Sequence, residues 1–545
     1  MVVDMTLEAW NHTLEANLTS NWSLIRKFAP RMKQQGAGRI LNVSSYFGGE
    51  KYLAVAYPNR ADYSVSKAGQ RALAEILSRH LGPEIQINAM APGPVDGARL
   101  RGLGGAPGLF ARRGRLILEN KRLNRVHEAL LASLEGTDGG EILQRLAANV
   151  VEGLAAWDGA PEALRRLAAQ VGEGRPEAAA TRYLLSRPLA EKLINRLVGG
   201  GALDAAQGGH FLEVFTPPPE GDFFDARDIE RTAQKIEVGI LDRLHLHRMP
   251  TDEQVALSTV FSLADEIVSG ETFHPSGGLK FDRSVTEGEM LLRPGAEDLQ
   301  QLAGRHVVLI GEALRDELVA IAHGLLEQSV GSLTLLTKSA ETAEALRACI
   351  EAPGPGTVVG VQAVGEELEA GLDAVRGQTG RIDAVVSTPF ARLPMNPLAA
   401  EAGESWDRVL SRDAFARLLD EQLTHHFRVA RKCALMPRCQ IVLVTPETSR
   451  ASTREEFALA LFIKNSLHAF TVTLGVEGER LPTEPAVNQV QLTRRARAEE
   501  PSNDQEMAEE MERIVQAVML CCVPAVSPSQ SRYLARIFRG NAVTV

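Results

Sequence analysis

Several features that mark other classes of protein are scarce in this sequence of 545 residues. It has only five cysteines, without CxxC spacing and in an odd number, so a disulfide framework is excluded and a reducing, cytoplasmic setting is expected. No unbroken apolar run reaches the ~18 residues that a membrane-spanning helix needs. The N-terminal stretch has the pattern of an amphipathic helix rather than of a signal peptide.

Basic residues are not in excess either. The 59 Lys and Arg oppose 69 Asp and Glu, which gives a net charge of −10. This balance indicates neither nucleic-acid binding nor attraction to an anionic membrane surface. The composition, 44% hydrophobic and 23% charged, is that of a globular protein. At ~150 residues per domain, the length predicts three or four domains.

The first part of the sequence, residues 1–98, alternates between helical and strand patterns. Apolar residues spaced by a helical turn predict helices, and short buried runs bounded by glycine or proline predict strands. Strands and helices with such short joints are typical of a parallel α/β sheet. The expected elements are helices over 6–34 and 61–80 and strands over 39–45 and 85–91.

The rest of the sequence predicts an insertion and a second α/β unit. Residues 99–248 are rich in Ala, Leu, Arg and Glu and predict a mostly helical insertion, after which residues 249–285 complete the first unit with a helix and a strand. Residues 286–303 read as a linker. Residues 304–545 predict a second unit with strands over 306–312, 333–338, 382–390, 440–446 and 487–493. The expected fold is α/β: two tandem Rossmann-like units with parallel sheets, plus the helical insertion.

The sharpest chemical signal is a tyrosine and a lysine one helical turn apart, Tyr63 and Lys67. An ammonium close to a phenol favours the phenolate, which suits a group that transfers protons at neutral pH. On its own the pair is weak evidence, because the same spacing often arises by chance on solvent-exposed helices.

Three further features accompany this pair. Ser45 ends a buried strand, where its hydroxyl can bind a substrate carbonyl at the carboxyl edge of the sheet. Asn17 lies inside the first long helix, an unfavourable position for asparagine. A Pro92-Gly93 turn follows the strand over 85–91. Asn, Ser, Tyr, Lys and the Pro-Gly turn, in this order and spacing, resemble the short-chain dehydrogenase/reductase superfamily over residues 5–98 and again over 249–280.

This resemblance implies an oxidoreductase that uses NADPH. In its terms Tyr63 is the general acid, Lys67 activates it and binds the nicotinamide ribose, and Ser45 holds the substrate carbonyl. Asn17 anchors a water of a proton relay. The implied cofactor contacts are Tyr63, Lys67, Pro92, Gly93 and Val95. Gly97 stands where the superfamily usually has a threonine.

A basic stretch begins directly after the Pro-Gly turn. Between residues 99 and 125, eight basic residues oppose Glu119 alone, within an otherwise acidic protein. One interpretation is a solvated helix face. The other is a site for a polyanionic substrate, because arginine matches the geometry of carboxylates and phosphates, and the superfamily covers its substrate with this segment. The candidate substrate-binding residues are Arg99, Arg101, Arg112, Arg113 and Arg115.

The second unit repeats the layout without the chemistry. Lys464 matches the lysine of the Tyr–Lys pair, but Ala460 stands in the tyrosine position, and Gly311 is the only glycine of the expected phosphate loop. We therefore expect this unit to be inactive. We expect no metal site at His425-His426 or at His245 and His247, since no companion ligands are spaced for one. The glycine-rich stretch 102–108 predicts a flexible hinge rather than a dinucleotide loop.

The tandem layout narrows the resemblance further. Long stretches, among them residues 5–27, 40–52, 57–75 and 107–124, resemble the C-terminal half of the bifunctional malonyl-CoA reductase family. The resemblance implies reduction of malonyl-CoA to malonate semialdehyde and free CoA with NADPH, without a covalent enzyme intermediate. We also expect the two units to pack as a pseudo-dimer through residues 6–34 and 61–80 against 413–434 and 454–475, and the protein to form a homodimer.

One part of the superfamily pattern has no match in this sequence. The glycine-rich phosphate loop and the Asn-Asn-Ala-Gly strand precede the Asn17 helix in the superfamily, so an N-terminal part of the same protein is an expected partner, and this chain alone is expected to be inactive and to bind little NADPH. Two alternatives stay open. One is a carbonyl reductase that converts malonate semialdehyde to 3-hydroxypropionate, and the other is a non-catalytic dimerising scaffold.

Overall fold

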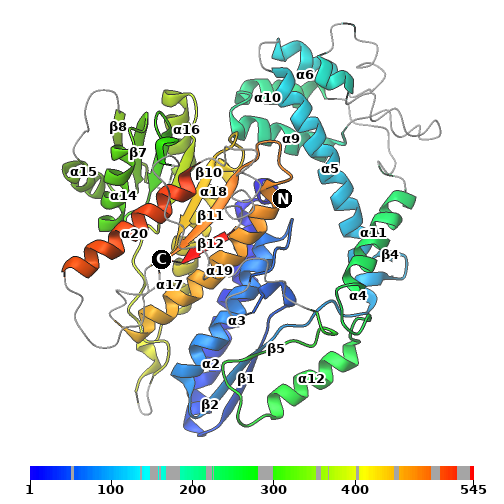
Figure 1. Ribbon diagram of the computed structural model, residues 1–545. Coiled ribbons are helices and arrows are strands. Elements are labelled where there is room, and N and C mark those ends of the chain that lie inside the picture. Colours follow the sequence, from blue (N-terminus) through cyan, green and yellow to red (C-terminus); the bar gives the residue numbers. More distant parts are fainter. Residues whose placement is uncertain are drawn as a thin grey trace.

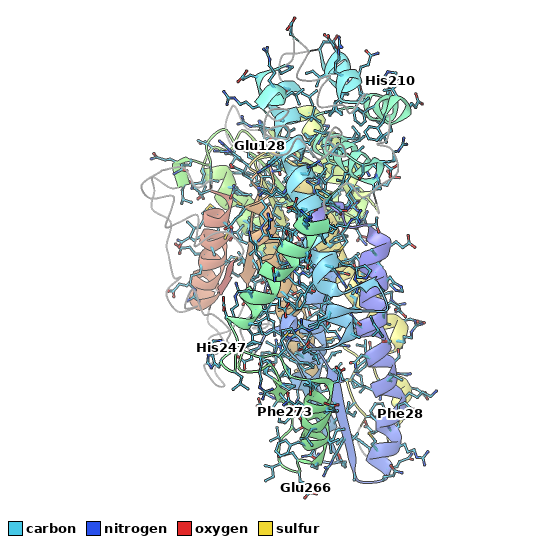
Figure 2. The ribbon with its side chains drawn as sticks, turned by 90° about the vertical axis from the view of Figure 1, so that its right-hand side faces the viewer. Phe28, Glu128, His210, His247, Glu266 and Phe273 are labelled. Carbon is cyan, nitrogen blue, oxygen red and sulfur yellow. The ribbon has the colours of Figure 1, made fainter. Side chains whose placement is uncertain are left out.

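The structure is a computed structural model. It describes residues 1–50, 54–134, 138–147, 158, 161–166, 185–215, 224, 226–279, 299–350, 358–365, 367–400, 404–446, 453–492, 504–523 and 541–544. Most of the predicted linker therefore lies outside the described residues. The molecule is long: His210 of the insertion lies at one end and Glu266 of the first unit at the other (Figure 2).

The first unit is built on a parallel sheet of three strands within the described residues, in the order β1-β2-β5. β1 pairs with β2 in a register that places Gly38 opposite Ile85 and Val43 opposite Met90. β5, which follows the insertion, pairs with β2. The strands are β1 (Gly38–Val43), β2 (Ile85–Met90) and β5 (Thr272–Phe273).

Helices cover this sheet much as the periodicity predicts. The predicted helix over 6–34 is continuous, but it contains a π-helical turn at Glu15–Thr19 that the sequence pattern did not predict. Thr6 caps its start by accepting a hydrogen bond from the Ala9 amide. The helices of the unit are α1 (Leu7–Leu14), α2 (Ser20–Gln34), α3 (Ala61–Leu81) and α12 (Asp252–Ala264).

The insertion is mostly helical and forms a lobe beside the two sheets (Figure 1). The glycine-rich stretch, where the sequence predicts a flexible hinge, is an antiparallel hairpin of β3 (Gly102–Leu103) and β4 (Ala106–Pro107). Gly104 and Gly105 turn it with φ of 62° and 84°, a conformation that favours glycine. The helices are α4 (Ala98–Arg101), α5 (Leu109–Leu134), α6 (Gly139–Ala147), α9 (Arg187–Gly200), α10 (Ala205–Val214) and α11 (Ala226–Leu241).

Within its described residues, the second unit has a seven-stranded parallel sheet in the order β12-β11-β10-β9-β6-β7-β8. All five predicted strands are present, and β8 and β12 are additional. The strands are β6 (His306–Ile310), β7 (Ser332–Thr337), β8 (Val358–Ala363), β9 (Ala384–Ser387), β10 (Gln440–Val444), β11 (Ala486–Gln491) and β12 (Asn541–Thr544). The helices are α14 (Arg315–Glu327), α15 (Ala340–Cys349), α16 (Leu368–Thr379), α17 (Arg412–Leu419), α18 (His425–Cys433), α19 (Arg454–Gly478) and α20 (Asp504–Cys522).

The two units share one hydrophobic core. Trp10 stacks on Phe427 with 4.3 Å between ring centroids and a 6° interplanar angle, and its Nε1 donates to Thr424 Oγ1 at 3.1 Å. Side chains from α1, α2 and α3 lie in the same core cluster as those of α17, α18 and α19. The predicted pseudo-dimer is confirmed. By length and composition α19 could span a membrane, but 67% of its most apolar window is buried in this interface and the core around it.

The stability of this interface can be tested at Trp10. Its side chain is 1% exposed, so Trp10→Ala removes the stacked ring and leaves a cavity, and we expect a loss of about 3–5 kcal/mol of unfolding free energy. Phe28→Ala on α2 is the matched control, because that ring is 51% exposed and lies at the surface (Figure 2). Urea unfolding of both variants would measure the difference. Equal midpoints would show that the two units do not depend on this contact.

Candidate active site

Three loops of the first unit meet at the carboxyl edge of its sheet. Tyr46 after β1 donates its backbone N–H to Pro92 O after β2 at 2.9 Å. The Gly93 amide in turn donates to Pro275 O after β5 at 3.3 Å. A side chain at Gly93 would meet Ser276 at 2.9 Å, so only glycine allows this close approach. The predicted Pro-Gly turn is therefore fixed beside the end of β1.

Helix α3 brings Tyr63 and Lys67 to this edge. Lys67 Nζ lies 5.6 Å from the centroid of the half-buried Tyr63 ring. Lys67 Nζ also donates to Val43 O, the last carbonyl of β1, at 2.9 Å. The backbone oxygen of Lys67 accepts from Ser44 Oγ at 2.7 Å, which fixes the helix against the strand end. The structure thus joins the tyrosine–lysine pair to the end of β1.

The surroundings of Lys67 shift its titration. Burial, with a smaller contribution from the nearby Arg99 guanidinium, lowers the pKa of Lys67 to about 8. Lys67 is therefore mostly an ammonium at neutral pH and loses its proton under mildly alkaline conditions. A group whose pKa lies near the ambient pH can change its protonation state when a charged ligand binds beside it.

Ser45 follows β1 and caps a short 3₁₀ turn, Tyr46–Gly48. Its Oγ accepts a hydrogen bond from the Phe47 amide at 3.3 Å. Because a hydroxyl also carries one proton to donate, Ser45 can still donate to a substrate oxygen. This is the position predicted for the carbonyl-binding serine.

Asn17 lies in the π turn. Its Nδ2 donates to Ser66 Oγ at 2.8 Å. Its backbone oxygen accepts from Gln70 Nε2 at 2.7 Å. The first long helix is therefore joined to α3 directly, through side chains.

The predicted basic stretch divides into two groups. Arg101 is paired with Asp96 at 2.6 Å and Glu237 at 2.8 Å, and Arg115 is paired with Glu119 at 3.1 Å. Arg112 is exposed on α5. Arg99 and Arg113 lie closer to the site. The Arg99 guanidinium contributes to the lowered pKa of Lys67, and Arg113 Cζ lies 4.4 Å from the centroid of the Tyr57 ring.

Sequence reasoning missed three residues around the tyrosine–lysine pair, of which Gln70 contacts the lysine. Tyr57 packs edge-on against the Tyr63 ring at 5.8 Å and stacks on Phe47, and Arg60 Cζ lies 5.2 Å from the centroid of the Tyr63 ring. The third is Gln70. The spacing held a usable signal, because Arg60 precedes Tyr63 by three residues and Gln70 follows Lys67 by three, one helical turn in each case.

The second unit helps to hold this part of the first. The Tyr57 amide donates to Thr473 Oγ1 at 3.1 Å, and the Asn59 amide donates to Glu477 Oε1 at 2.6 Å. Thr473 and Glu477 are both on α19. The segment leading into the tyrosine helix is thus fixed by the unit that lacks the tyrosine.

The corresponding edge of the second unit is closed by its own side chains and backbone. The amides of Glu312 and Ala313, in the loop after β6, both donate to Pro389 O. The Glu312 carboxylate accepts from the Ser339 amide at 2.6 Å, which places a negative charge at the loop. A phosphate would need those amides free and would be repelled by the carboxylate. Across the described residues, no group of three or more His, Cys, Asp or Glu could hold a metal ion.

Comparison with known proteins agrees with this geometry. The model of a family described as enoyl-(acyl carrier protein) reductase matches residues 1–129. A trans-4-hydroxycyclohexanecarboxylate dehydrogenase of Sinomonas cyclohexanicum is 34% identical over 111 residues, 19% of this chain and 40% of that protein. The 3-oxoacyl-[acyl-carrier-protein] reductase FabG of Staphylococcus aureus is 34% identical over 94 residues, which are 17% of this chain and 36% of that protein. The chain thus spans about two fifths or less of these relatives.

Two solved structures match over far more of the chain. The C-domain of a bacterial malonyl-CoA reductase, solved with NADP, is 46% identical with a TM-score of 0.93, covering all of this chain and 83% of that one. The N-domain of a bacterial malonyl-CoA reductase shares the fold, with 16% identity, a TM-score of 0.56, and coverage of 94% of this chain and 72% of that one. The first match extends over both units and the insertion. The chain therefore belongs to the malonyl-CoA reductase family, within the short-chain dehydrogenase/reductase superfamily of oxidoreductases, and matches its C-domain.

Proposed function

We propose that the first unit reduces the thioester of malonyl-CoA to malonate semialdehyde and free CoA, with NADPH as the reductant. The observation that carries this proposal is the meeting of Ser45, Tyr63 and Lys67 at one sheet edge, with arginines beside them. All five cysteines belong to the second unit. The part of the first unit present in this sequence therefore offers no cysteine for a covalent thioester, which favours direct reduction.

The residues of the chain act on the reacting oxygen. Ser45 donates a hydrogen bond to the thioester carbonyl, and Tyr63 donates its proton as negative charge develops on that oxygen. The Lys67 ammonium stabilises the tyrosinate that remains, because opposite charges attract strongly in a site sheltered from water. Together these groups make the thioester carbon more electrophilic and stabilise the tetrahedral intermediate.

The residues at this edge fit the nicotinamide end of a dinucleotide. Lys67 and the Pro92–Val95 turn lie together at the carboxyl ends of the strands, where α/β sheets bind such ligands. Lys67 would hold the ribose, and the backbone of Val95 would meet the carboxamide. When bound, the reduced cofactor supplies the hydride.

Binding of the pyrophosphate of the dinucleotide requires residues beyond this sheet edge. β1 pairs on one side only within the described residues, whereas β10, its counterpart in the second unit, continues into β9 and β6. Val43 at the end of β1 is 56% exposed. We infer that a further α/β segment of the same protein pairs with β1 and completes the cofactor site, which an exposed parallel edge favours.

The arginines beside the tyrosine suit an anionic thioester. Arg60, over the Tyr63 ring, is already paired with Asp62 at 3.2 Å, but Arg113 lies over the Tyr57 ring and Arg99 is close enough to lower the pKa of Lys67. A carboxylate at the end of a short acyl chain, or the phosphates of CoA, would neutralise these charges. A contact with the acyl carboxylate favours malonyl-CoA over a CoA thioester whose acyl group is uncharged.

A direct assay of substrates tests the proposal. The complete protein, which includes the further α/β segment that pairs with β1, is incubated with NADPH or NADH and with malonyl-CoA, acetyl-CoA or malonate semialdehyde, and oxidation of the cofactor and release of free thiol are measured. We expect NADPH-dependent thiol release from malonyl-CoA and much slower turnover of acetyl-CoA. Efficient reduction of the semialdehyde without thiol release from malonyl-CoA would favour the carbonyl reductase instead, and no turnover of any substrate would favour the scaffold.

A further inference from the structure

A glutamine lies between the active-site lysine and the first long helix. Gln70 Oε1 accepts from Lys67 Nζ at 2.7 Å, and Gln70 Nε2 donates to the backbone oxygen of Asn17 at 2.7 Å. Gln70 is 7% exposed, and both contacts are partly buried. Lys67, Gln70 and Asn17 form an unbroken chain of hydrogen bonds from the active-site ammonium to the π turn.

The orientation of the Gln70 amide follows from its two partners. An ammonium only donates and a backbone carbonyl only accepts, so Oε1 has to face Lys67 and Nε2 has to face Asn17. The π turn prepares the second contact, because its Ser20 amide donates five residues back to Glu15 O. This shift of register leaves a carbonyl of the turn available to a partner outside the helix.

A chain that passes through a glutamine does not carry protons as a chain of water or hydroxyl groups does. A water molecule accepts and donates at the same atom, whereas an amide accepts at its oxygen and donates at its nitrogen. Passing a proton would convert Gln70 to an imidic acid. The route from Lys67 to the first helix is therefore closed to proton transfer.

We propose that Gln70 is a positioning residue that holds Lys67 and closes a proton route that thioester reduction does not need. The inference rests on the proposed function. As hydride from the reduced nicotinamide dinucleotide adds to the thioester carbon, Tyr63 gives its proton to the oxygen. When the C–S bond of the hemithioacetal breaks, sulfur leaves as a thiolate with the bonding pair. The hydroxyl proton then returns to the tyrosinate, so the turnover draws no proton through Lys67.

Reduction of an aldehyde has a different proton balance. The alcohol product keeps the proton that Tyr63 donates, so the tyrosinate has to be reprotonated in every turnover. A closed route beyond Lys67 slows that step. The hydrogen bond from Lys67 to Gln70 thus favours release of the aldehyde as the product over its further reduction to the alcohol.

Two variants of matched design test this inference. Gln70→Ala opens a space with Lys67 Nζ and Asn17 O on opposite sides, which is polar enough to hold a bridging water. Gln70→Met fills the same space without a polar atom. The kcat/KM values for malonate semialdehyde and malonyl-CoA are measured for both variants and for the unmodified protein, with solvent deuterium isotope effects on each.

We expect the ratio of aldehyde to thioester activity to rise roughly tenfold or more in Gln70→Ala, because a water restores the proton route. In Gln70→Met the ratio stays at the value of the unmodified protein, although both activities fall because Lys67 loses an acceptor. Equal ratios in all three proteins would overturn the inference. Failure of the complete unmodified protein, with the segment that pairs with β1 present, to reduce malonyl-CoA would instead refute the proposed function.

A second readout needs neither cofactor nor turnover. Acylation of the Lys67 amine is followed against pH by peptide mass spectrometry on the protein without NADPH. Since a hydrogen bond to the ammonium favours its charged form, Gln70→Met should lower the pKa of Lys67, and Gln70→Ala, with water in place of the amide, should lower it less. Identical titration curves in all three proteins would show that Gln70 does not hold Lys67.

Discussion

Replacing Tyr63 with phenylalanine is expected to lower kcat for malonyl-CoA reduction by roughly a thousandfold or more, because the variant keeps the ring but loses the proton donor. The ring should stay in place, since it is packed against Tyr57 and lies under Arg60. Affinity for NADPH should change little, because Lys67 holds the ribose. Steady-state kinetics together with fluorescence titration of NADPH would separate the two effects.

Tyr57→Phe is the matched control for this variant. It also removes one phenolic oxygen, from the ring that stacks on Phe47 at 3.6 Å, and it retains that stacking. We expect its activity to fall only a few-fold, since its hydroxyl group has no role in the proposed proton transfer. If Tyr63→Phe keeps more than a few per cent of the unmodified rate, Tyr63 is not the general acid.

The parts of this site that could be predicted are those that local sequence specifies. Tyr63 and Lys67 lie one turn apart on one helix, so their proximity follows from helix geometry alone. Ser45 and the Pro92-Gly93 turn each follow a strand, and the carboxyl ends of neighbouring parallel strands meet at the same edge. The packing of the two units was also predictable, because the apolar faces of their helices are repeated in the sequence.

The parts that could not be predicted depend on contacts between distant segments. Gln70 reaches Asn17 across 53 residues, through a π turn whose side chains carry no distinguishing pattern. The division of the arginines has the same cause, since Glu237, which neutralises Arg101, lies far along the insertion. Only the folded chain shows which charges of the basic stretch are already paired.

Replacing Lys67 with methionine is expected to lower kcat/KM by roughly a hundredfold or more and to weaken NADPH binding, because the tyrosinate and the ribose both lose the ammonium. Methionine keeps the length of the apolar stem, so α3 should remain packed against β1. The rate of the unmodified enzyme should fall as pH rises through about 8, since burial lowers the pKa of Lys67 to that range and only its charged form, present below it, stabilises the tyrosinate.

The pH profile distinguishes this role of Lys67 from a merely structural one. Lys67→Arg keeps a cation that does not lose its proton in the accessible range, so its alkaline limb should move to higher pH even if its maximum rate is lower. Lys67→Met should show no limb near pH 8. If Lys67→Met retains that limb, another group titrates there, and the fall in rate cannot be assigned to the lysine. If the alkaline limb of Lys67→Arg lies at the same pH as that of the unmodified enzyme, a group other than Lys67 titrates there as well.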